Sequence, residues 1–539
     1  MSNASDVTSK LWEMANKLRG TMDASEYKNY ILPFMFYRYL SENQDEYLAD
    51  NYLEEFYEVT DPKEKEEYLQ DISKGIGYAI DPEYVWDKMV SKIENHKIKA
   101  SDFQDMFDSF NANAKRNAAA EDDFANVFSD VNLGDTRLGS STNERAKALN
   151  DIVLMINEFN FKHDSGHDIL GDVYEYLIGQ FAANAGKKGG EFYTPHEVSQ
   201  VLSKIVTLNS KESDDQFHVY DPTMGSGSLL LTVQKELPNG DAEGSVDFYG
   251  QELNTTTYNL ARMNLMMHGV NYRNMNLKRA DTLDADWPFD EKDGVQVPVK
   301  FDAVVANPPY SQKWDIKNVD REKDTRFKGF GIAPASKADY AFVLHGLYHL
   351  EKTGTMAIVL PHGVLFRGAA EGKIRKNIIK ENLLDAVIGL PANLFYGTSI
   401  PTCVLVFKGR ESRGDNKDIL FIDASNEFEK DKNQNKLTSE NIEKIVETYR
   451  KREDVDKYAH VASIEEIEEN DFNLNIPRYV DTFEEEEVIP LSEIVTNINE
   501  TRSEIEKTTN ELYSLLDELV GTTPEVDKEF QEFLAKFKK

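Results

Sequence analysis

A short apolar run that ends in a glycine-containing turn limits the possible folds of this chain more than any other feature. Residues 217–220 are Phe-His-Val-Tyr, and they lead through Asp221-Pro-Thr-Met-Gly-Ser-Gly into an apolar stretch that begins at Ser228. A strand, a Gly-x-Gly turn and an apolar helix make the first βα unit of a doubly wound α/β fold. Glycines at 225 and 227 let the backbone approach a ligand closely. The third glycine of the dinucleotide fingerprint and the Gly-Lys-Ser/Thr of a P-loop are both missing, which disfavours a diphosphate cofactor.

Carboxylates follow the next two strand-like segments. The segment 246–250 leads to Glu252, and Asp281 follows a third short segment. An acidic residue after the second strand of such folds commonly binds ribose, because a carboxylate accepts from both vicinal hydroxyls. Asp281 is placed to meet an adenine amino group. Each acid alone is typical of an ordinary surface charge, but the series after successive strands predicts one adenosine site.

The motif Asn307-Pro308-Pro309-Tyr310 directly follows Phe301–Ala306, an apolar run typical of a buried parallel strand. Open α/β sheets place their ligands in such loops. Two prolines remove two N–H donors, so the loop offers mainly carbonyl oxygens and the Asn307 amide. A planar amino group, on a base or on a carboxamide, could donate to the Asn307 and Pro308 oxygens while Tyr310 holds its plane. Taken alone, the motif is equally typical of a stiff turn.

The net charge of −35 over 539 residues argues against DNA binding by the chain as a whole. A protein that holds DNA by itself needs a basic face. Three explanations are open. The substrate is not nucleic acid, or a basic partner supplies much of the affinity for DNA, or the chain has a local basic patch that the net charge does not reveal. The candidate patch follows the Asn307 motif and consists of Lys313, Arg321, Lys323, Arg326 and Lys328, which are also typical of a solvated loop.

The length predicts about three domains. We expect an N-terminal helical domain at 1–165, an α/β domain at 166–425 and a charged helical region at 426–539. In the first, Asp23 can cap a helix that runs through Leu40 and that Pro33 should kink. In the last, apolar residues at helical spacing predict a long amphipathic helix from about Ser492 that assembles with another helix.

Residues 167–206 begin the expected α/β domain. A helix is expected over 169–181, followed by a glycine-rich loop and then by 191–196, Glu-Phe-Tyr-Thr-Pro-His. Thr194 and Pro195 suit the N-cap and first position of a helix over His196–Val206. His163 and His167 lack the pattern of a zinc site, so no metal is expected. The absence of a signal segment and of a long apolar run predicts a cytoplasmic protein without a membrane span.

The order of these motifs resembles the amino-group DNA methyltransferases that use S-adenosylmethionine. More closely, nearly the whole chain resembles the modification subunit of type I restriction-modification systems. Residues 18–28 and 36–42 are similar to that family's helical domain, and residues 190–195 resemble its cofactor-binding segment. Residues 336–342 and 393–402 resemble later methyltransferase segments.

The resemblance implies a Rossmann-like α/β methyltransferase core that transfers a methyl group from S-adenosylmethionine to N6 of an adenine flipped out of the duplex. Asn307 and Pro308 would orient the amino group within the catalytic motif 307–310, and Tyr310 would stack on the base. Phe395 could supply a second aromatic wall. The implied cofactor-binding residues are Glu191, Phe192, Tyr193, Thr194, Pro195, His196, Asp221, Gly225, Ser226, Gly227, Ser228, Glu252 and Asp281.

The resemblance also implies partners that account for the negative charge. Members of this family leave sequence recognition to a separate specificity subunit, and double-stranded DNA is engaged through the complex. Two copies of this chain per specificity subunit are expected, a restriction subunit is a further candidate, and the C-terminal amphipathic helix is the candidate docking element. Two alternatives remain open from the residues: a methyltransferase for protein glutamine side chains, and a non-enzymatic acidic DNA mimic.

Overall fold

The computed structural model divides the chain into two units, residues 1–481 and 482–539. The residues that it describes are 24–159, 170–184, 193–211, 216–242, 244–284, 287–316, 323–395, 398–431, 434–482 and 490–538. The expected cap at Asp23 and the two histidines at 163 and 167 lie outside them.

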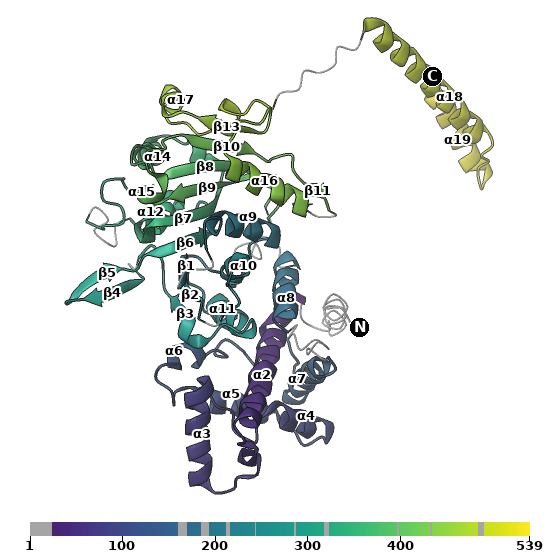
Figure 1. The fold of residues 1–539 in the computed structure, drawn as a ribbon. Coiled ribbons are helices and arrows are strands. Elements are labelled where there is room, and N and C mark those ends of the chain that lie inside the picture. The colour runs from purple at the N-terminus through teal and green to yellow at the C-terminus, as the bar shows by residue number, and fades with distance from the viewer. Residues whose placement is uncertain are drawn as a thin grey trace. The chain divides into compact units, whose positions relative to one another are not determined.

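A mixed sheet runs through the first unit and carries the candidate site (Figure 1). Its strand order is β13-β10-β8-β9-β7-β6-β1-β2-β3. The bounds are β1 (Phe217–Asp221), β2 (Val246–Glu252), β3 (Met275–Arg279), β6 (Phe301–Ala306), β7 (Leu350–Pro361), β8 (Leu384–Gly389), β9 (Thr402–Lys408), β10 (Ile419–Asp423) and β13 (Ala459–Ala462). Two small ribbons lie outside it, β4 (Phe289–Lys292) with β5 (Val295–Pro298) and β11 (Glu429–Lys430) with β12 (Asn435–Lys436).

The direction of winding reverses at β1. From β1 the chain adds β2 and β3 on one side, all parallel, and then returns to place β6 and β7 parallel on the other side. Such a switch point opens a crevice at the carboxyl ends of the strands, where ligands bind. The doubly wound fold is thus confirmed. The sequence did not predict that β9 would run antiparallel to both β7 and β8.

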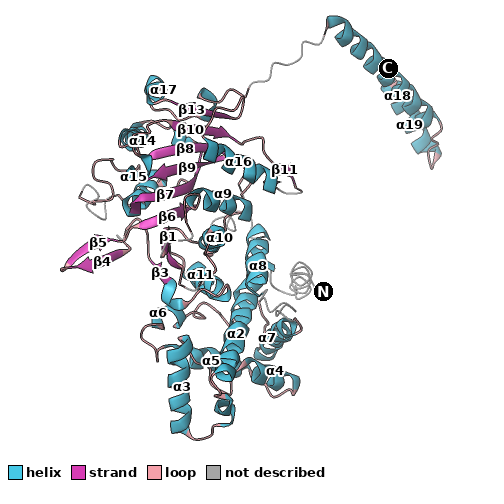
Figure 2. Cartoon of the chain, viewed as in Figure 1, coloured by secondary structure: helices cyan, strands magenta, loops and turns pink. Residues whose placement is uncertain are grey.

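Helices cover both faces of the sheet (Figure 2). Neighbouring strand residues face opposite sides, so Val219 belongs to one core and Tyr220 to the other. The core with Val219 includes residues of α9 (His196–Val206), α10 (Ser228–Glu236), α11 (Thr255–Met267) and α16 (Ser439–Lys451). The core with Tyr220 includes residues of α12 (Asp339–His349), α13 (Gly363–Phe366), α14 (Ala369–Lys380) and α17 (Ile464–Glu469). The four-residue α15 (Arg410–Arg413) follows β9.

The N-terminal helices contribute to the core on the Val219 side of the sheet, except that Leu69 and Ile72 pack in a separate small core with Leu48, Phe56 and Ala79. Their bounds are α2 (Ala24–Asp50), α3 (Pro62–Ile76), α4 (Trp86–Glu94), α5 (Ala100–Ala114), α6 (Glu121–Phe124) and α7 (Thr142–Asn157), followed by α8 (Leu170–Asn184). Helix α2 runs through Pro33 as one helix. Arg262 of α11 reaches across and donates to the carbonyl oxygens of Asp122 and Asp123, both at 2.9 Å. The helical part is therefore tied to the α/β part by buried polar contacts as well as by apolar packing.

Residues beyond 425 continue the first unit. Helix α16 buries Ile442, Ile445 and Val446, and strand β13 pairs antiparallel with β10. An apolar stripe on a charged helix explains this placement, because one face of α16 can pack while the other stays in water. The sheet therefore extends past the expected boundary at residue 425.

The second unit, described by itself, consists of α18 (Leu491–Asp517) and α19 (Pro524–Phe537). The predicted long helix from about Ser492 thus begins within one residue of the expected position. The apolar side chains Ile494, Ile498, Ile505, Leu512, Leu515 and Leu519 are exposed. Within the described part of the chain, every helix is too short or too polar to cross a lipid bilayer.

Candidate active site

The turn after β1 holds a buried carboxylate against a tightly wound backbone. Asp221 is 2% exposed, and burial raises the pKa of its side chain to about 7. Its Oδ1 accepts from the backbone N–H of Thr223 at 2.8 Å. Gly225 and Gly227 have φ of 54° and 76°. A Cβ on Gly227 would lie 2.4 Å from Leu265 Cδ1, so conformation and packing both require glycine there.

Hydroxyl groups and a helix N-terminus line the same turn. Ser226 Oγ and Ser228 Oγ lie 3.1 Å apart, and Asn264 Nδ2 donates to the Ser226 carbonyl oxygen at 2.9 Å. Gly227 is the N-cap of α10 and makes no side-chain cap. Backbone N–H groups at that end therefore stay available to a negatively charged group such as a carboxylate.

Glu252 and Asp281 lie at the ends of neighbouring strands. Glu252 accepts from the backbone N–H of Asn254 at 2.8 Å, and burial raises the pKa of its carboxyl group. Asp281 accepts from the backbone N–H of Leu283 at 2.9 Å. Thr282 Oγ1 donates to the Pro222 carbonyl oxygen at 2.5 Å. This bond ties the Asp281 loop to the turn after β1, so the three carboxylates follow three adjacent strands at one edge.

Asn307 follows β6, the neighbour of β1 on the other side, and both ends of its amide are engaged. Nδ2 donates to Thr194 Oγ1 at 3.1 Å, and the Tyr310 hydroxyl donates to Oδ1 at 2.8 Å. Desolvation holds the pKa of Tyr310 well above its usual value, so the phenol stays protonated as a donor. The Phe395 ring meets the Tyr310 ring edge to face, with centroids 6.1 Å apart.

A carboxylate that the sequence reasoning missed fixes the end of the 307–310 motif. Asp339, 1% exposed, accepts from the Ser311 backbone N–H at 2.7 Å. Ser311 has φ of 52°, a strained conformation for a residue with a side chain. Arg367 donates to Asp339 at 2.9 Å and to Glu371 at 2.8 Å. The sequence marks 336–342 as a segment similar to the family and assigns no role to Asp339.

A small cavity brings together residues from three separate stretches of the chain. Its lining is Tyr193, Thr194, Asp221, Thr223, Met224, Gly225, Ser226, Ser228, Leu229 and Asn307. Glu252 and Asp281 do not line it and lie beside it at the ends of β2 and β3. Glu191 and Phe192 lie outside the described residues, and His196 is exposed at the start of α9.

One local prediction in this region was wrong. Pro195, not Thr194, is the N-cap of α9, and no side chain caps that helix. The Thr194 hydroxyl instead accepts the hydrogen bond from Asn307. The Thr194 hydroxyl, which the local sequence pattern predicts as a helix cap, thus bonds a residue far away in the chain instead.

Only some residues of the predicted basic patch are exposed on the surface. Arg326 is 3% exposed; its guanidinium pairs with Asp324 at 2.7 Å and donates to the Thr282 carbonyl oxygen at 2.8 Å. It therefore anchors the loop and cannot contact a phosphate. Lys313, Lys323 and Lys328 are exposed, and Arg321 lies outside the described residues.

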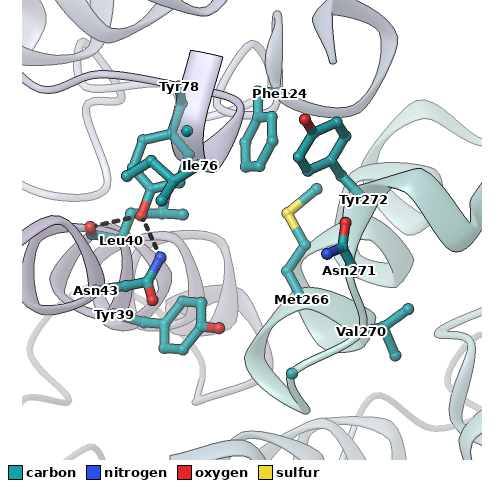
Figure 3. A pocket seen from close by; sticks show the side chains of 12 residues that line it. Tyr39, Leu40, Asn43, Ile76, Tyr78, Phe124, Met266, Val270, Asn271 and Tyr272 are labelled. Atoms are coloured by element: carbon teal, nitrogen blue, oxygen red, sulfur yellow. Dashed lines mark hydrogen bonds between the residues drawn. The ribbon is translucent and has the colours of Figure 1, made fainter. Parts of the chain in front are cut away.

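A larger cavity lies away from these residues, between the N-terminal helices and the α/β part (Figure 3). It has a volume of about 270 Å³, and Tyr39, Tyr78, Phe124 and Tyr272 contribute aromatic walls. Inside it Asn43 donates to the Tyr78 hydroxyl, which donates to the Leu40 carbonyl oxygen, at 3.0 and 2.7 Å. None of the predicted site residues lines this cavity.

Comparisons with known proteins agree with the geometry. The N-6 DNA Methylase family matches residues 165–488, and the HsdM N-terminal domain family matches residues 7–156. The type I restriction enzyme MpnII methylase subunit of Mycoplasma pneumoniae is 38% identical over 92% of this chain and 92% of its own length. The MjaVIII methylase subunit of Methanocaldococcus jannaschii is 34% identical over 70% of this chain and 64% of its own.

Solved structures lead to the same group. The methyltransferase subunit of a type I restriction-modification system from Streptococcus thermophilus is 44% identical, with a TM-score of 0.80 over 89% of this chain and 100% of that one. These matches decide against the glutamine methyltransferase and the DNA mimic. The chain belongs to the N-6 DNA methylase family, as a methylase subunit of the type I restriction-modification kind, an adenine-specific DNA methyltransferase.

Proposed function

We propose that the methyl donor is S-adenosylmethionine and that it binds at the carboxyl ends of β1, β2 and β3. The donor set fits this molecule. Asp221 would meet the cationic methionine part, Glu252 the ribose hydroxyls and Asp281 the adenine amino group, while the backbone of 225–228 would receive the carboxylate. Two observations support the assignment: Gly225, Ser226 and Ser228 line the same cavity as Asp221, and the Asp221 carboxylate is desolvated by burial. When bound, the cofactor supplies an electrophilic methyl group.

The residues of the 307–310 motif would prepare the acceptor. An adenine amino nitrogen is a poor nucleophile, because its lone pair is delocalised into the ring. Hydrogen bonds to the Asn307 side-chain oxygen and the Pro308 carbonyl oxygen would align it and stabilise the positive charge that develops during attack. Positioning does the rest, so no side chain with a shifted pKa is needed as a base. The observation that carries this proposal is that Asn307 and Asp221 line one cavity.

The base must leave the duplex to reach this cavity, because its amino group is paired and stacked in DNA. Tyr310 and Phe395, already in edge-to-face contact, would hold the flipped ring. Pro309 keeps the loop rigid between Pro308 and Tyr310. Tyr193, Thr194 and Pro195 would close the cofactor end of the cavity, together with Glu191, Phe192 and His196 of the same segment.

A separate specificity subunit would supply sequence recognition, which accounts for a net charge of −35 on a DNA-modifying chain. Two copies of this chain per specificity subunit, and a restriction subunit in the larger assembly, complete the proposed complex. The exposed apolar stripe of α18 is the proposed docking element. The division into 1–165, 166–425 and 426–539 stays a proposal about which segments carry separate functions, because β13 and α16 of the last segment pack with the sheet of the second.

The experiment measures transfer of a labelled methyl group from S-adenosylmethionine to mixed-sequence duplex DNA. It compares this chain alone with the chain plus the specificity subunit encoded beside it. We expect transfer only with the partner. Transfer by the chain alone would place DNA recognition within it and refute the proposed division of labour. Binding of the cofactor without transfer in either mixture would refute DNA as the substrate.

A further inference from the structure

The side-chain amide of Asn307 has two chemically different ends, and only one of them suits the proposed reaction. Its oxygen accepts from an amino group, whereas its NH2 would face the adenine NH2 donor to donor. A half-turn of the amide exchanges the two ends with little change in shape. Contacts that restrict rotation of the amide therefore matter for the reaction.

Two hydroxyl groups hold the amide, one at each end. Thr194 Oγ1 accepts from Nδ2 at 3.1 Å, and the Tyr310 hydroxyl donates to Oδ1 at 2.8 Å. The two differ in what happens when a base enters. The amino group of the base would have to share Oδ1 with the Tyr310 hydroxyl or displace it, because an amide oxygen accepts at most two hydrogen bonds. The bond to Thr194 uses the other end of the amide, so it can persist throughout the reaction.

The backbone around Thr194 is well anchored for this purpose. Pro195 follows it as the N-cap of α9 with its φ fixed at −52°, and it is buried. Val198, Val201 and Leu202 of α9 are fully buried in the core beneath. Threonine is also stiff at χ1, because its Cβ is branched. The Thr194 hydroxyl, 113 residues before Asn307 in the chain, is therefore held by a rigid backbone.

We infer that Thr194 is a positioning residue for methyl transfer: its hydroxyl holds the plane of the Asn307 amide in place for the target base. The inference rests on the proposed function of Asn307 and adds a role to a segment otherwise assigned to the cofactor. Loss of the hydroxyl leaves Nδ2 without its acceptor and leaves only the Tyr310 contact to hold the amide, so the amide can rotate away from the reactive position. The chemical step then slows even when cofactor and DNA are saturating.

The test uses the complex with its specificity subunit and measures single-turnover methyl transfer at saturating S-adenosylmethionine and DNA. Thr194→Val replaces the hydroxyl by a methyl group at nearly constant volume. One neutral hydrogen bond is worth about 1 kcal/mol, so we expect the rate to fall roughly 5- to 10-fold. Thr194→Ser retains the hydroxyl and should stay within about twofold of wild type. Thr194→Ala removes the same acceptor with less bulk and serves as the second test if the valine variant does not fold.

Cofactor affinity, measured separately by titration, distinguishes positioning from binding. A Thr194→Val complex that binds S-adenosylmethionine more weakly yet reaches the wild-type rate at saturation would overturn the inference, because Thr194 would then be only a cofactor contact. A serine variant as slow as the valine variant would overturn it too, since the hydroxyl would not be the cause. Absence of transfer by the wild-type complex would instead refute the proposed function itself.

Discussion

Replacement of Asp221 by asparagine should remove a pH dependence from cofactor binding. Burial raises the pKa of this carboxyl group to about 7, so near neutral pH roughly half the molecules carry it protonated. The proposed ligand brings an ammonium and a sulfonium group, which favour the ionised carboxylate. Binding to the protonated form must therefore release a proton, and affinity falls as the pH falls.

The magnitude follows from the pKa. Below about pH 7 the ionised fraction of Asp221 falls tenfold per pH unit, so S-adenosylmethionine should bind roughly 30-fold more weakly at pH 5.5 than at pH 8. Asp221→Asn keeps the shape but has no charge to lose, so its affinity should be low and should lack the part of the pH dependence that comes from Asp221. The ligand's own titration affects both proteins equally and cancels in the comparison.

Isothermal titration calorimetry across this pH range measures the affinity. Repeating the titration in buffers with different heats of ionisation gives the number of protons released on binding. Asn307→Ala is the matched control, because it changes the same cavity without changing its charge, and it should keep the wild-type slope. Equal slopes for wild type and Asp221→Asn would refute the assignment of Asp221 to the cofactor.

Three further predictions concern other parts of the chain. Asn307→Ala should lower methyl transfer by at least about 100-fold while cofactor binding persists; loss of both together in the paired assays would argue against separate roles. Asp385→Ala leaves Arg413, paired at 2.6 Å and 1% exposed at its side chain, as an uncompensated buried charge, so urea unfolding should show a loss of about 3–5 kcal/mol; an unchanged midpoint would contradict this. Ile498→Asp on the apolar stripe of α18 should abolish co-purification with the specificity subunit, whereas Ser503→Asp on the opposite face should not; equal retention would exclude the stripe as the docking element.

Local patterns predicted the parts of the site that follow strands. The apolar runs that end at Tyr220 and Ala306 are strands, and parallel pairing then brings the residues after them to one edge of the sheet. The acids at 252 and 281 follow by the same logic. These inferences needed only strand length, β-branched residues and turn chemistry, which are readable within a few positions.

Contacts between distant segments could not be read in this way. Thr194 looked like a helix cap, yet its hydroxyl meets an amide 113 residues later. Arg326 looked like part of a basic surface, yet it is buried beneath carbonyl oxygens of a loop 43 and 44 residues earlier. Asp339 stabilises the strained Ser311 from the start of another helix. The charged composition of 426–539 also did not predict that α16 would pack on the sheet. A helix rich in charged residues can still bury one apolar face.

The most direct test of the account is to identify the atom that receives the methyl group. The complex of this chain with its specificity subunit is incubated with duplex DNA and S-adenosylmethionine carrying an isotopically labelled methyl group, and the DNA nucleosides and protein peptides are separated and weighed by mass spectrometry. The account predicts labelled N6-methyladenine in DNA, and its loss in the Asn307→Ala complex. Label on a protein glutamine or on cytosine, or labelled N6-methyladenine that persists in Asn307→Ala, would contradict it.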